Sequence, residues 1–398
     1  MNNTCVISIG NLASFSRGLT YSRNDEVDFS ENVVLRSNNI DLATNTLNYD
    51  ELKYISDAIV IPNDKKLQRN SIFMCMSNGS KQHLGKVAYI DKDYPYAFGG
   101  FMGLIRPNEE LIVPKLLYYY FCSSKFKRFL SSIGNGANIN NIKFVDIAKD
   151  CISIPEKLIQ QSIVVELDKI NELIRLKKEQ LKDYDNLAQS IFYEMFGDPI
   201  ENEKGWEVKK LGDVCEVSSF KRVLVEDVLE KGPVPFIRGT ELSAICKENK
   251  REYKMYITME HYERVKNISG VPNVGDLLIP SINAEGLVWV VDTPEPMYYK
   301  DGRVLWVHVD QNSISSIALQ RILNNLIKDN YSKITNGAVF AELNLSILRS
   351  FPIILPPLSI QNAFANKINL IEKQKAEIQS TMADLETLLA SRMQYWFD

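Results

Sequence analysis

The fold of this chain is decided by residues 154–199, which read IPEKLIQQSIVVELDKINELIRLKKEQLKDYDNLAQSIFYEMFGDP. Between Ile163 and Met195, ten positions follow one another at alternating spacings of four and three residues, and nine of the ten are apolar. An apolar repeat of 3.5 residues kept over several heptads is typical of a coiled-coil helix. Pro155 suits the first turn of a helix and Gly197 its end, so the pattern predicts one long helix.

The same stretch returns 201 residues later, without a gap from about residue 135 to the C-terminus. Asn135-Gly136-Ala137 reappears as Asn336-Gly337-Ala338, and Ile159-Gln160 reappears as Ile360-Gln361. The earlier parts of the two copies also correspond, with small changes of length. Because internal repeats reveal architecture, the chain is predicted to be a tandem duplication of one globular domain followed by one long helix.

This duplication divides the chain into four predicted segments. They are a globular domain in residues 1–154, a long helix in 155–198, a second globular domain in 199–355 and a second long helix in 356–398. Short β-branched or aromatic runs between Gly, Pro and Asn indicate mostly β-structure in each domain. Apolar spacing predicts one helix from Pro114 to Leu130 and its counterpart from Ile314 to Ile327. The fold class is therefore α+β, with two mixed α/β domains.

The two long helices carry matching apolar seams. Each helix of about 40 residues would be a rod of roughly 60 Å, which overhangs a domain of this size. Burial of both seams is achieved most simply by an antiparallel coiled coil with pseudo-two-fold symmetry and a domain at either end. Packing of each helix on its own domain is the alternative. The predicted seam residues are Ile163, Leu167, Ile170, Ile174, Leu181, Tyr184, Ile191, Phe364, Ile368, Ile371, Ile378, Leu385 and Leu389.

The composition is that of a soluble protein with a core. Apolar residues make up 45% and charged residues 24% of 398 residues, and the net charge is −4. No apolar run approaches the roughly 20 residues of a membrane span, and the N-terminus does not read as a signal peptide. Six scattered cysteines without a CxxC pair indicate reduced side chains. We therefore expect a cytoplasmic protein without membrane contact.

The sequence lacks the motifs of a catalytic centre. His83, His261 and His308 do not have metal-ligand spacing, and GxSxG, Walker and GxGxxG motifs are absent. Phe98-Gly99-Gly100-Phe101 has the wrong spacing for a cofactor loop and reads as a turn. The Glu-x-Lys triplets at 248–250 and 252–254 occur in one copy only. We therefore expect no catalytic, cofactor-binding or metal-binding residue, and no enzyme activity of the chain by itself.

Several motifs resemble those of the specificity subunits of type I restriction–modification systems. The motifs are Gln160-Gln161-Ser162-Ile163-Val164, residues 192–199 (FYEMFGDP), residues 355–361 (LPPLSIQ) and residues 236–242 (FIRGTEL). The resemblance covers the whole chain in order. It implies two target-recognition domains held apart by an antiparallel coiled coil, each of which reads one half of a split DNA sequence across a spacer.

The resemblance also implies partners and cofactors. The expected partners are double-stranded DNA, two methyltransferase (modification) subunits bound along the helices, and restriction/translocase subunits. S-adenosylmethionine, ATP and Mg would be bound by those partner subunits, and this chain would bind no cofactor. The alternative function is a coiled-coil scaffold that tethers partners without reading DNA. A single-chain restriction or modification enzyme is a third hypothesis, but its motifs are missing.

Turns rich in Arg, Lys and Asn supply the candidate DNA contacts, because Arg and Lys bind guanine and Asn binds adenine in direct readout. Arg36 and Arg238 are the strongest of these candidates, since each follows a strand at the same place in the two copies. Each candidate could instead be a solvated loop residue, and the Asn-Gly-Ala pairs could be structural turns. The candidates are Arg17, Arg36, Asn38, Asn39, Asn78, Lys81, Asn135, Asn138, Lys143, Lys221, Arg222, Arg238, Thr240, Asn283, Lys333 and Asn336.

Overall fold

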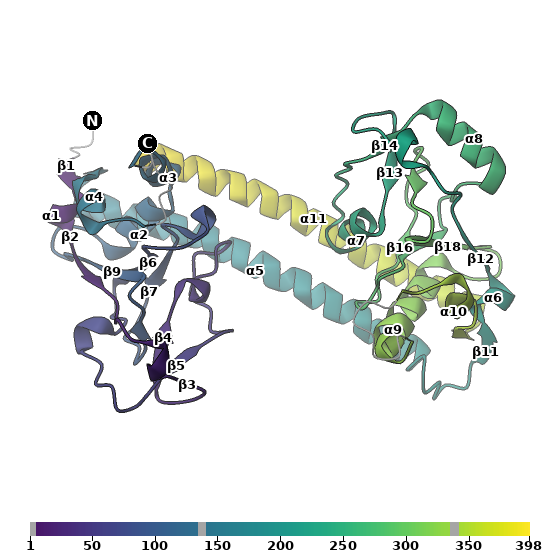
Figure 1. Ribbon diagram of the computed structural model, residues 1–398, viewed down its shortest axis with the longest axis horizontal. Helices are drawn as coiled ribbons and strands as arrows, with labels where there is room; N and C mark the ends of the chain where they lie inside the picture. Colours follow the sequence, from purple (N-terminus) through teal and green to yellow (C-terminus); the bar gives the residue numbers. More distant parts are fainter. Residues whose placement is uncertain (1–4, 134–140, 335–341) are drawn as a thin grey trace. The chain divides into compact units, whose positions relative to one another are not determined.

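The computed structural model describes residues 5–133, 141–334 and 342–398, with all their side chains except those of 332–334 (Figure 1). The chain forms two compact units. Unit 1 comprises Met1–Lys178 and Gln379–Asp398, and unit 2 comprises Glu179–Ile378. The two long helices, α5 (Lys157–Phe196) and α11 (Leu358–Phe397), each contribute residues to both units. Each unit therefore combines one globular domain with parts of both long helices.

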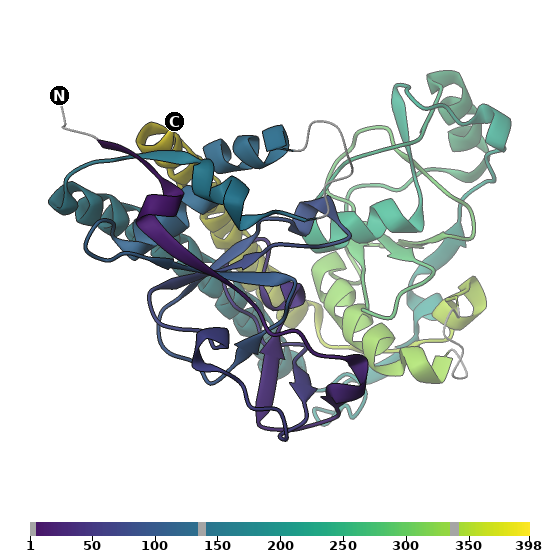
Figure 2. The same ribbon diagram turned by 60° about the vertical axis from the view of Figure 1, so that its left-hand side comes forward.

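Unit 1 contains two four-stranded sheets, which come forward in Figure 2. The first is antiparallel with strand order β2-β9-β6-β7, and the second has the order β3-β5-β4-β8, in which β8 runs parallel to β4. The strands are β1 (Cys5–Ser8), β2 (Ala13–Arg17), β3 (Glu26–Val27), β4 (Asn32–Leu35), β5 (Lys53–Ile55), β6 (Ser71–Cys75), β7 (Val87–Ile90), β8 (Ala97–Phe98), β9 (Met102–Pro107) and β10 (Cys151–Ile154). The helices are α1 (Ile9–Leu12), α2 (Pro114–Cys122), α3 (Ser124–Ile133) and α4 (Phe144–Lys149).

Unit 2 repeats this topology. Its antiparallel sheet has the order β12-β18-β15-β16, and in its second sheet, β14-β13-β17, strand β17 again runs parallel to β13. The strands are β11 (Glu207–Lys210), β12 (Glu216–Ser219), β13 (Val234–Ile237), β14 (Tyr256–Ile257), β15 (Leu277–Pro280), β16 (Trp289–Val290), β17 (Tyr298–Tyr299), β18 (Val304–His308) and β19 (Pro352–Leu355). The helices are α6 (Leu211–Val214), α7 (Gly239–Glu248), α8 (Met259–Ser269), α9 (Ser316–Ile334) and α10 (Leu345–Arg349). The repeated strand order confirms the predicted mixture of α and β in two copies.

One predicted helix is interrupted in the structure. The helix predicted from Pro114 to Leu130 is wrong, because α2 and α3 are separated at Ser123. The Ser123 hydroxyl donates to the Tyr120 carbonyl (2.6 Å) and accepts the Phe126 N–H (3.3 Å), so it ends one helix and caps the next. The two copies also differ between β13 and β15, where α7 and α8 stand at the places of two 3-10 turns, residues 37–39 and 63–65, that flank β5 in the first domain. The two domains therefore differ most in that connection.

A buried glutamine fixes the start of each long helix to its own domain. Gln160, which is 2% exposed, accepts the Val113 N–H (2.8 Å) and donates to the Pro155 carbonyl (2.9 Å). Its equivalent, Gln361, accepts the Ser315 N–H (2.9 Å) and donates to the Pro356 carbonyl (2.8 Å). Each glutamine thus pairs a backbone N–H of the domain and a carbonyl just before the long helix, so no end of its buried amide is left unpaired.

In each unit, α5 and α11 pack on each other. In unit 1, Glu166 of α5 pairs with the Arg392 guanidinium of α11, and the Trp396 indole donates to the same carboxylate (3.2 Å). In unit 2, the Lys375 ammonium lies 2.8 Å from the Asp185 carboxylate. Hydrogen bonds from Arg392 hold the pKa of Glu166 below its usual value. The predicted seam residues are all buried or half-buried.

The end of each long helix enters the core of a domain. Phe397, the last residue of α11, is buried in unit 1 with its ring centroid 5.9 Å from that of Tyr120. Phe196, at the end of α5, is buried in unit 2 with its centroid 4.8 Å from that of Phe364. Each domain thus holds the start of one long helix and the end of the other.

The variant Gln361→Ala tests the role of the buried glutamine. It leaves the Ser315 N–H and the Pro356 carbonyl unpaired, so we expect the free energy of unfolding to fall by about 1–3 kcal/mol. Urea unfolding followed by tryptophan fluorescence measures this loss, because Trp206, Trp289 and Trp306 all lie in unit 2. The exposed Gln394 of α11 gives the control variant Gln394→Ala. Equal losses for the two variants would contradict a special role for Gln361.

Candidate nucleic-acid interface

The predicted DNA-contacting loops of the first domain meet at one end of its sheets. The Arg17 guanidinium, at the end of β2, donates to the Asn141 side chain (3.4 Å). Asn78, which follows β6, donates to the Ser37 hydroxyl (3.0 Å) beside the end of β4. An isolated bridge between Ser77 and Asn141 links these two contacts, so the ends of three strands form one surface. We call it the first loop face, and it consists of Arg17, Arg36, Ser37, Asn38, Asn78, Phe101 and Asn141.

The second domain has a corresponding surface. The Gly302 N–H donates to the Ser219 hydroxyl at the end of β12 (3.2 Å), and the Ser281 N–H after β15 donates to the Arg303 carbonyl (3.0 Å). The Lys300 N–H donates to the Ile237 carbonyl at the end of β13 (2.9 Å). The same strand ends therefore meet in both domains. The second loop face consists of Lys221, Arg222, Arg238, Thr240, Ile282 and Arg303.

Most of the described candidates remain accessible. Lys81, Lys143, Lys221, Arg222 and Thr240 are exposed, and Arg17, Arg36, Asn38, Asn78 and Arg238 are half-buried. Asn135, Asn138 and Asn336 lie outside the described residues, and the side chain of Lys333, near the end of α9, is not described. The loop faces are therefore defined from the other candidates.

Asn39 and Asn283 are buried and serve the backbone, contrary to the prediction that they contact DNA. The Asn39 side chain accepts the Arg36 N–H (2.8 Å) and donates to the Glu51 carbonyl (3.2 Å). The Asn283 side chain accepts the Leu287 N–H (2.6 Å) and donates to the Leu287 carbonyl (2.8 Å). Because these amides are used inside the protein at less than 3% exposure, we assign them to the structure of their turns.

Arg36 and Arg238 begin a helical turn at equivalent positions, but their electrostatic surroundings differ. The Arg238 guanidinium donates to both carboxylate oxygens of Glu241 (2.5 and 3.1 Å). Burial raises the pKa of Glu241, but hydrogen bonds from Arg238 and Thr240 outweigh it and hold the pKa at about 2. At the corresponding position the first domain has the neutral Asn39. Because no carboxylate stands at that position, Arg36 is the better candidate for a new contact.

Phe101 and Arg303 belong to the loop faces but were not among the candidates predicted from the sequence. Each residue follows a glycine and directly precedes β9 or β18. Phe101 is 73% exposed, and Arg303 forms an ion pair with Glu342. A comparison of the two copies after each Gly-containing turn could have found both positions. A search restricted to Arg, Lys and Asn could not have identified Phe101.

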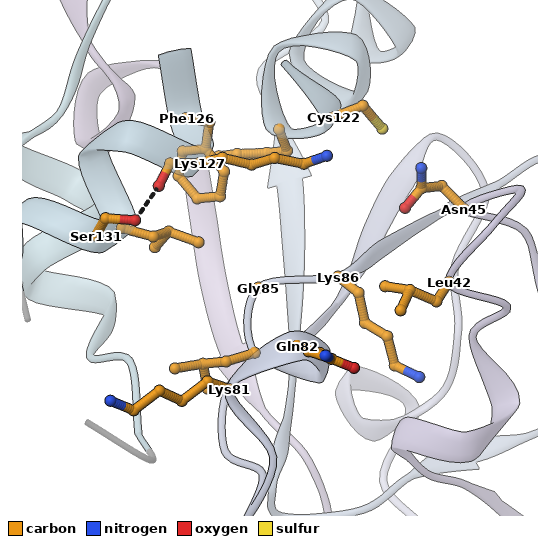
Figure 3. Close-up of a pocket in the computed structure, with 13 residues that line it drawn as sticks. Leu42, Asn45, Lys81, Gln82, Gly85, Lys86, Cys122, Phe126, Lys127 and Ser131 are labelled. Atoms are coloured by element: carbon orange, nitrogen blue, oxygen red, sulfur yellow. Dashed lines mark hydrogen bonds between the residues drawn. The ribbon is translucent and has the colours of Figure 1, made fainter. Parts of the chain in front are cut away.

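A cavity of about 470 Å³ in unit 1 lacks the features of a catalytic centre (Figure 3). Its lysines, Lys81, Lys86 and Lys127, point in different directions, and the Lys86 ammonium donates to the Ile40 carbonyl (2.8 Å). Burial lowers the pKa of Lys86 and raises the pKa of the Cys122 thiol to about 12, which keeps this sulfur protonated and unreactive.

Residues 5–133, 141–334 and 342–398 contain no cluster of three His, Cys, Asp or Glu side chains suited to a metal ion. Within the same ranges, no helix has the length and apolar character that crossing a membrane requires.

The family model and the curated relatives that match this chain all belong to one family of proteins. A family model described as "Type I restriction modification DNA specificity domain" matches residues 2–183 and again residues 203–384. The chain is 26% identical over 229 residues to the type I restriction enzyme EcoKI specificity subunit of Escherichia coli (strain K12), which covers 56% of this chain and 48% of that protein. It is 30% identical over 162 residues to the StySPI specificity subunit of Salmonella potsdam, covering 40% of this chain and 34% of that protein. The chain thus spans half or less of the length of these curated relatives.

Two solved structures share the fold. The S subunit of the type I restriction–modification system of M. genitalium superposes with a TM-score of 0.58 at 14% identity, covering 100% of this chain and 96% of that one. A chain from work on complex assembly and conformational transition of the type I R-M system gives a TM-score of 0.60 at 17% identity, covering 98% and 96%. At these identities the likeness is one of fold.

The pH dependence of stability tests the Arg238–Glu241 pair. The Glu241 pKa of about 2, against an ordinary 4.5, means that the carboxylate stabilises the fold above pH 4.5 and that this stabilisation is lost as the pH falls toward 2. We expect Glu241→Gln to cost about 1–3 kcal/mol at pH 7, since Arg238 is partly exposed to solvent screening. The difference from the unsubstituted protein should fall by more than half at pH 3 in urea unfolding.

The matched control is Glu248→Gln, because Glu248 is exposed at the C-terminal end of the same helix, α7. Its effect on the free energy of unfolding should be small and independent of pH. A Glu241→Gln effect that stays constant between pH 7 and pH 3 would contradict the low pKa of Glu241.

Proposed function

Because this chain belongs to the family of type I restriction–modification DNA specificity proteins, we propose that it is the subunit that selects the DNA sequence for such a complex. The observation that carries this proposal is the duplication of one fold with a loop face at the same strand ends in both copies. A scaffold without DNA readout would not require two equivalent surfaces rich in Arg, Lys and Asn.

Each loop face contacts one half of a split DNA site. Arginine binds guanine and asparagine binds adenine in the major groove, while other cations hold the phosphates. The first loop face offers Arg36, Asn38 and Asn78 for these roles, and the second offers Lys221, Arg222 and Arg238. Because the side chains of the two faces differ, the two half-sites have different sequences.

The long helices set the distance between the half-sites as an antiparallel coiled coil. The ion pairs Glu166–Arg392 and Asp185–Lys375 support this part of the proposal, because they fit one antiparallel register within two residues. Positions 375 and 392 continue the four-three spacing of the α11 seam. The two ion pairs explain why a lysine and an arginine are tolerated there, because each has an acidic partner on α5. The length of the coiled coil then determines the spacer.

Exposed apolar residues of α5 provide a docking surface for methyltransferase subunits. Leu158, Val165 and Leu176 are exposed, and their spacings of 7 and 11 residues place them on one side of the helix. An exposed apolar stripe on a helix is typical of a protein–protein contact. Those partners, together with the restriction subunits, would supply S-adenosylmethionine, ATP and Mg chemistry. This chain supplies recognition.

The variant Arg36→Ala tests the DNA-reading role. In the complex with methyltransferase subunits, loss of a bidentate contact to a base should weaken binding to the recognised DNA by about 1–3 kcal/mol, with little change for unrelated DNA. Arg238→Ala should cost less, because Arg238 must first leave Glu241. Competition binding at fixed salt measures both effects.

The matched control is Arg69→Ala, since Arg69 is exposed and lies before β6, at the opposite end of that strand from Asn78. Its loss should leave both affinities unchanged. If Arg36→Ala weakens all DNA sequences equally, Arg36 contacts phosphate. If binding to the recognised DNA is unaffected, Arg36 does not contact DNA.

A further inference from the structure

Phe101 presents an exposed aromatic ring on a rigid backbone. The side chain is 73% exposed, yet its carbonyl accepts the N–H groups of both Met76 and Ser77 (3.0 Å each). The next residue, Met102, donates its N–H to the Gly99 carbonyl (2.8 Å). Because these bonds already fix the turn, a contact through the ring would lose little additional conformational entropy of the backbone.

The neighbouring segment 18–20 packs directly on this turn. The Leu19 N–H donates to the Phe98 carbonyl (2.7 Å), and a Cβ on Gly18 would lie 2.1 Å from the Gly99 carbonyl oxygen. A Cβ on Gly100 would lie 3.3 Å from the Thr20 hydroxyl. Side chains are thus excluded on the packed side, and Phe101 is the residue of the turn that points into solvent.

The equivalent position in the second domain is Arg303. The Ser281 N–H donates to the Arg303 carbonyl (3.0 Å), as the Met76 N–H does to that of Phe101. The Arg303 carbonyl lies 3.2 Å from where a Cβ on Gly239 would be, beside Arg238. In the first domain, a Cβ on Gly99, two residues before Phe101, would lie 3.8 Å from the Arg36 Cγ. One position of the loop face therefore carries an apolar ring in one domain and a cation in the other.

We propose that Phe101 is a specificity-determining residue that contacts the C5-methyl group of a thymine in the first half-site. This inference rests on the proposed function. Arg36 and Asn78 on the same face are suited to base edges in the major groove, where the thymine methyl is the apolar group that bases present. An exposed Phe ring gains free energy by burial against this methyl, whereas Arg303 favours an acceptor such as guanine or phosphate.

The test removes the Phe101 ring and the thymine methyl group, first separately and then together. The complex with methyltransferase subunits is titrated with its recognised DNA, in which each thymine of the first half-site is replaced in turn by deoxyuridine. At one position the loss of the methyl should weaken binding by about three- to tenfold. In Phe101→Ala, binding to the thymine DNA should be weaker by a similar factor, and the same deoxyuridine substitution should then have no further effect. Phe101→Leu should retain part of the discrimination.

The matched control is Phe29→Ala. Phe29 is 80% exposed in the same domain but precedes β4, at the opposite end of that strand from Arg36. The Phe29→Ala variant should bind the thymine DNA and the deoxyuridine DNA as the unsubstituted protein does. Equal deoxyuridine effects with and without the Phe101 ring, or no effect at any thymine, would overturn the inference while sequence-specific binding persists. Failure of the complex to distinguish any DNA sequence would instead overturn the proposed function.

Discussion

The attachment of each domain to two different helix ends is the constraint on which the rest of this structure depends. Gln160 and Gln361 tie the start of each long helix to the domain that precedes it. Phe397 and Phe196 bury the opposite helix ends, one in each unit. Each domain packs around the end of the long helix that starts at the other domain. The two copies of the repeat therefore depend on each other. A single copy would leave apolar seam positions without a partner.

Periodicity predicted the long helices well, because their apolar pattern is local and repeats over many turns. The break at Ser123 was not predictable in this way, because it depends on a single hydrogen bond. The Ser123 hydroxyl caps the start of α3, and α2 ends one residue earlier. Asn39 and Asn283 show the same limit for the site. Composition made them DNA candidates, but only the folded chain reveals that their amides bind the backbone. Phe101 escaped prediction because an aromatic residue after Gly-Gly reads as part of a turn.

The duplicated fold supports two chemically different surfaces. Arg238 is held by Glu241, so binding DNA through its guanidinium must break or share an ion pair. In the first domain the neutral Asn39 stands where the second domain has Glu241. Arg36 can therefore bind DNA without breaking an ion pair with that position. Phe101 and Arg303 also differ, because the first is an apolar ring and the second a cation. The strand order is maintained while the residues at strand ends change, so one scaffold carries two chemically different surfaces.

The most direct test of the account is the spacer of the recognised DNA after matched deletion of one heptad from each long helix, residues 175–181 and 378–384. These deletions preserve the apolar repeat and shorten the helix pair by about 10 Å, the length of roughly three base pairs. Mapping of methylated bases in DNA modified by the assembled complex should show a spacer shorter by about three base pairs between unchanged half-sites. An unchanged spacer, or altered half-sites at the original spacing, would contradict the claim that the paired helices separate two independent readers.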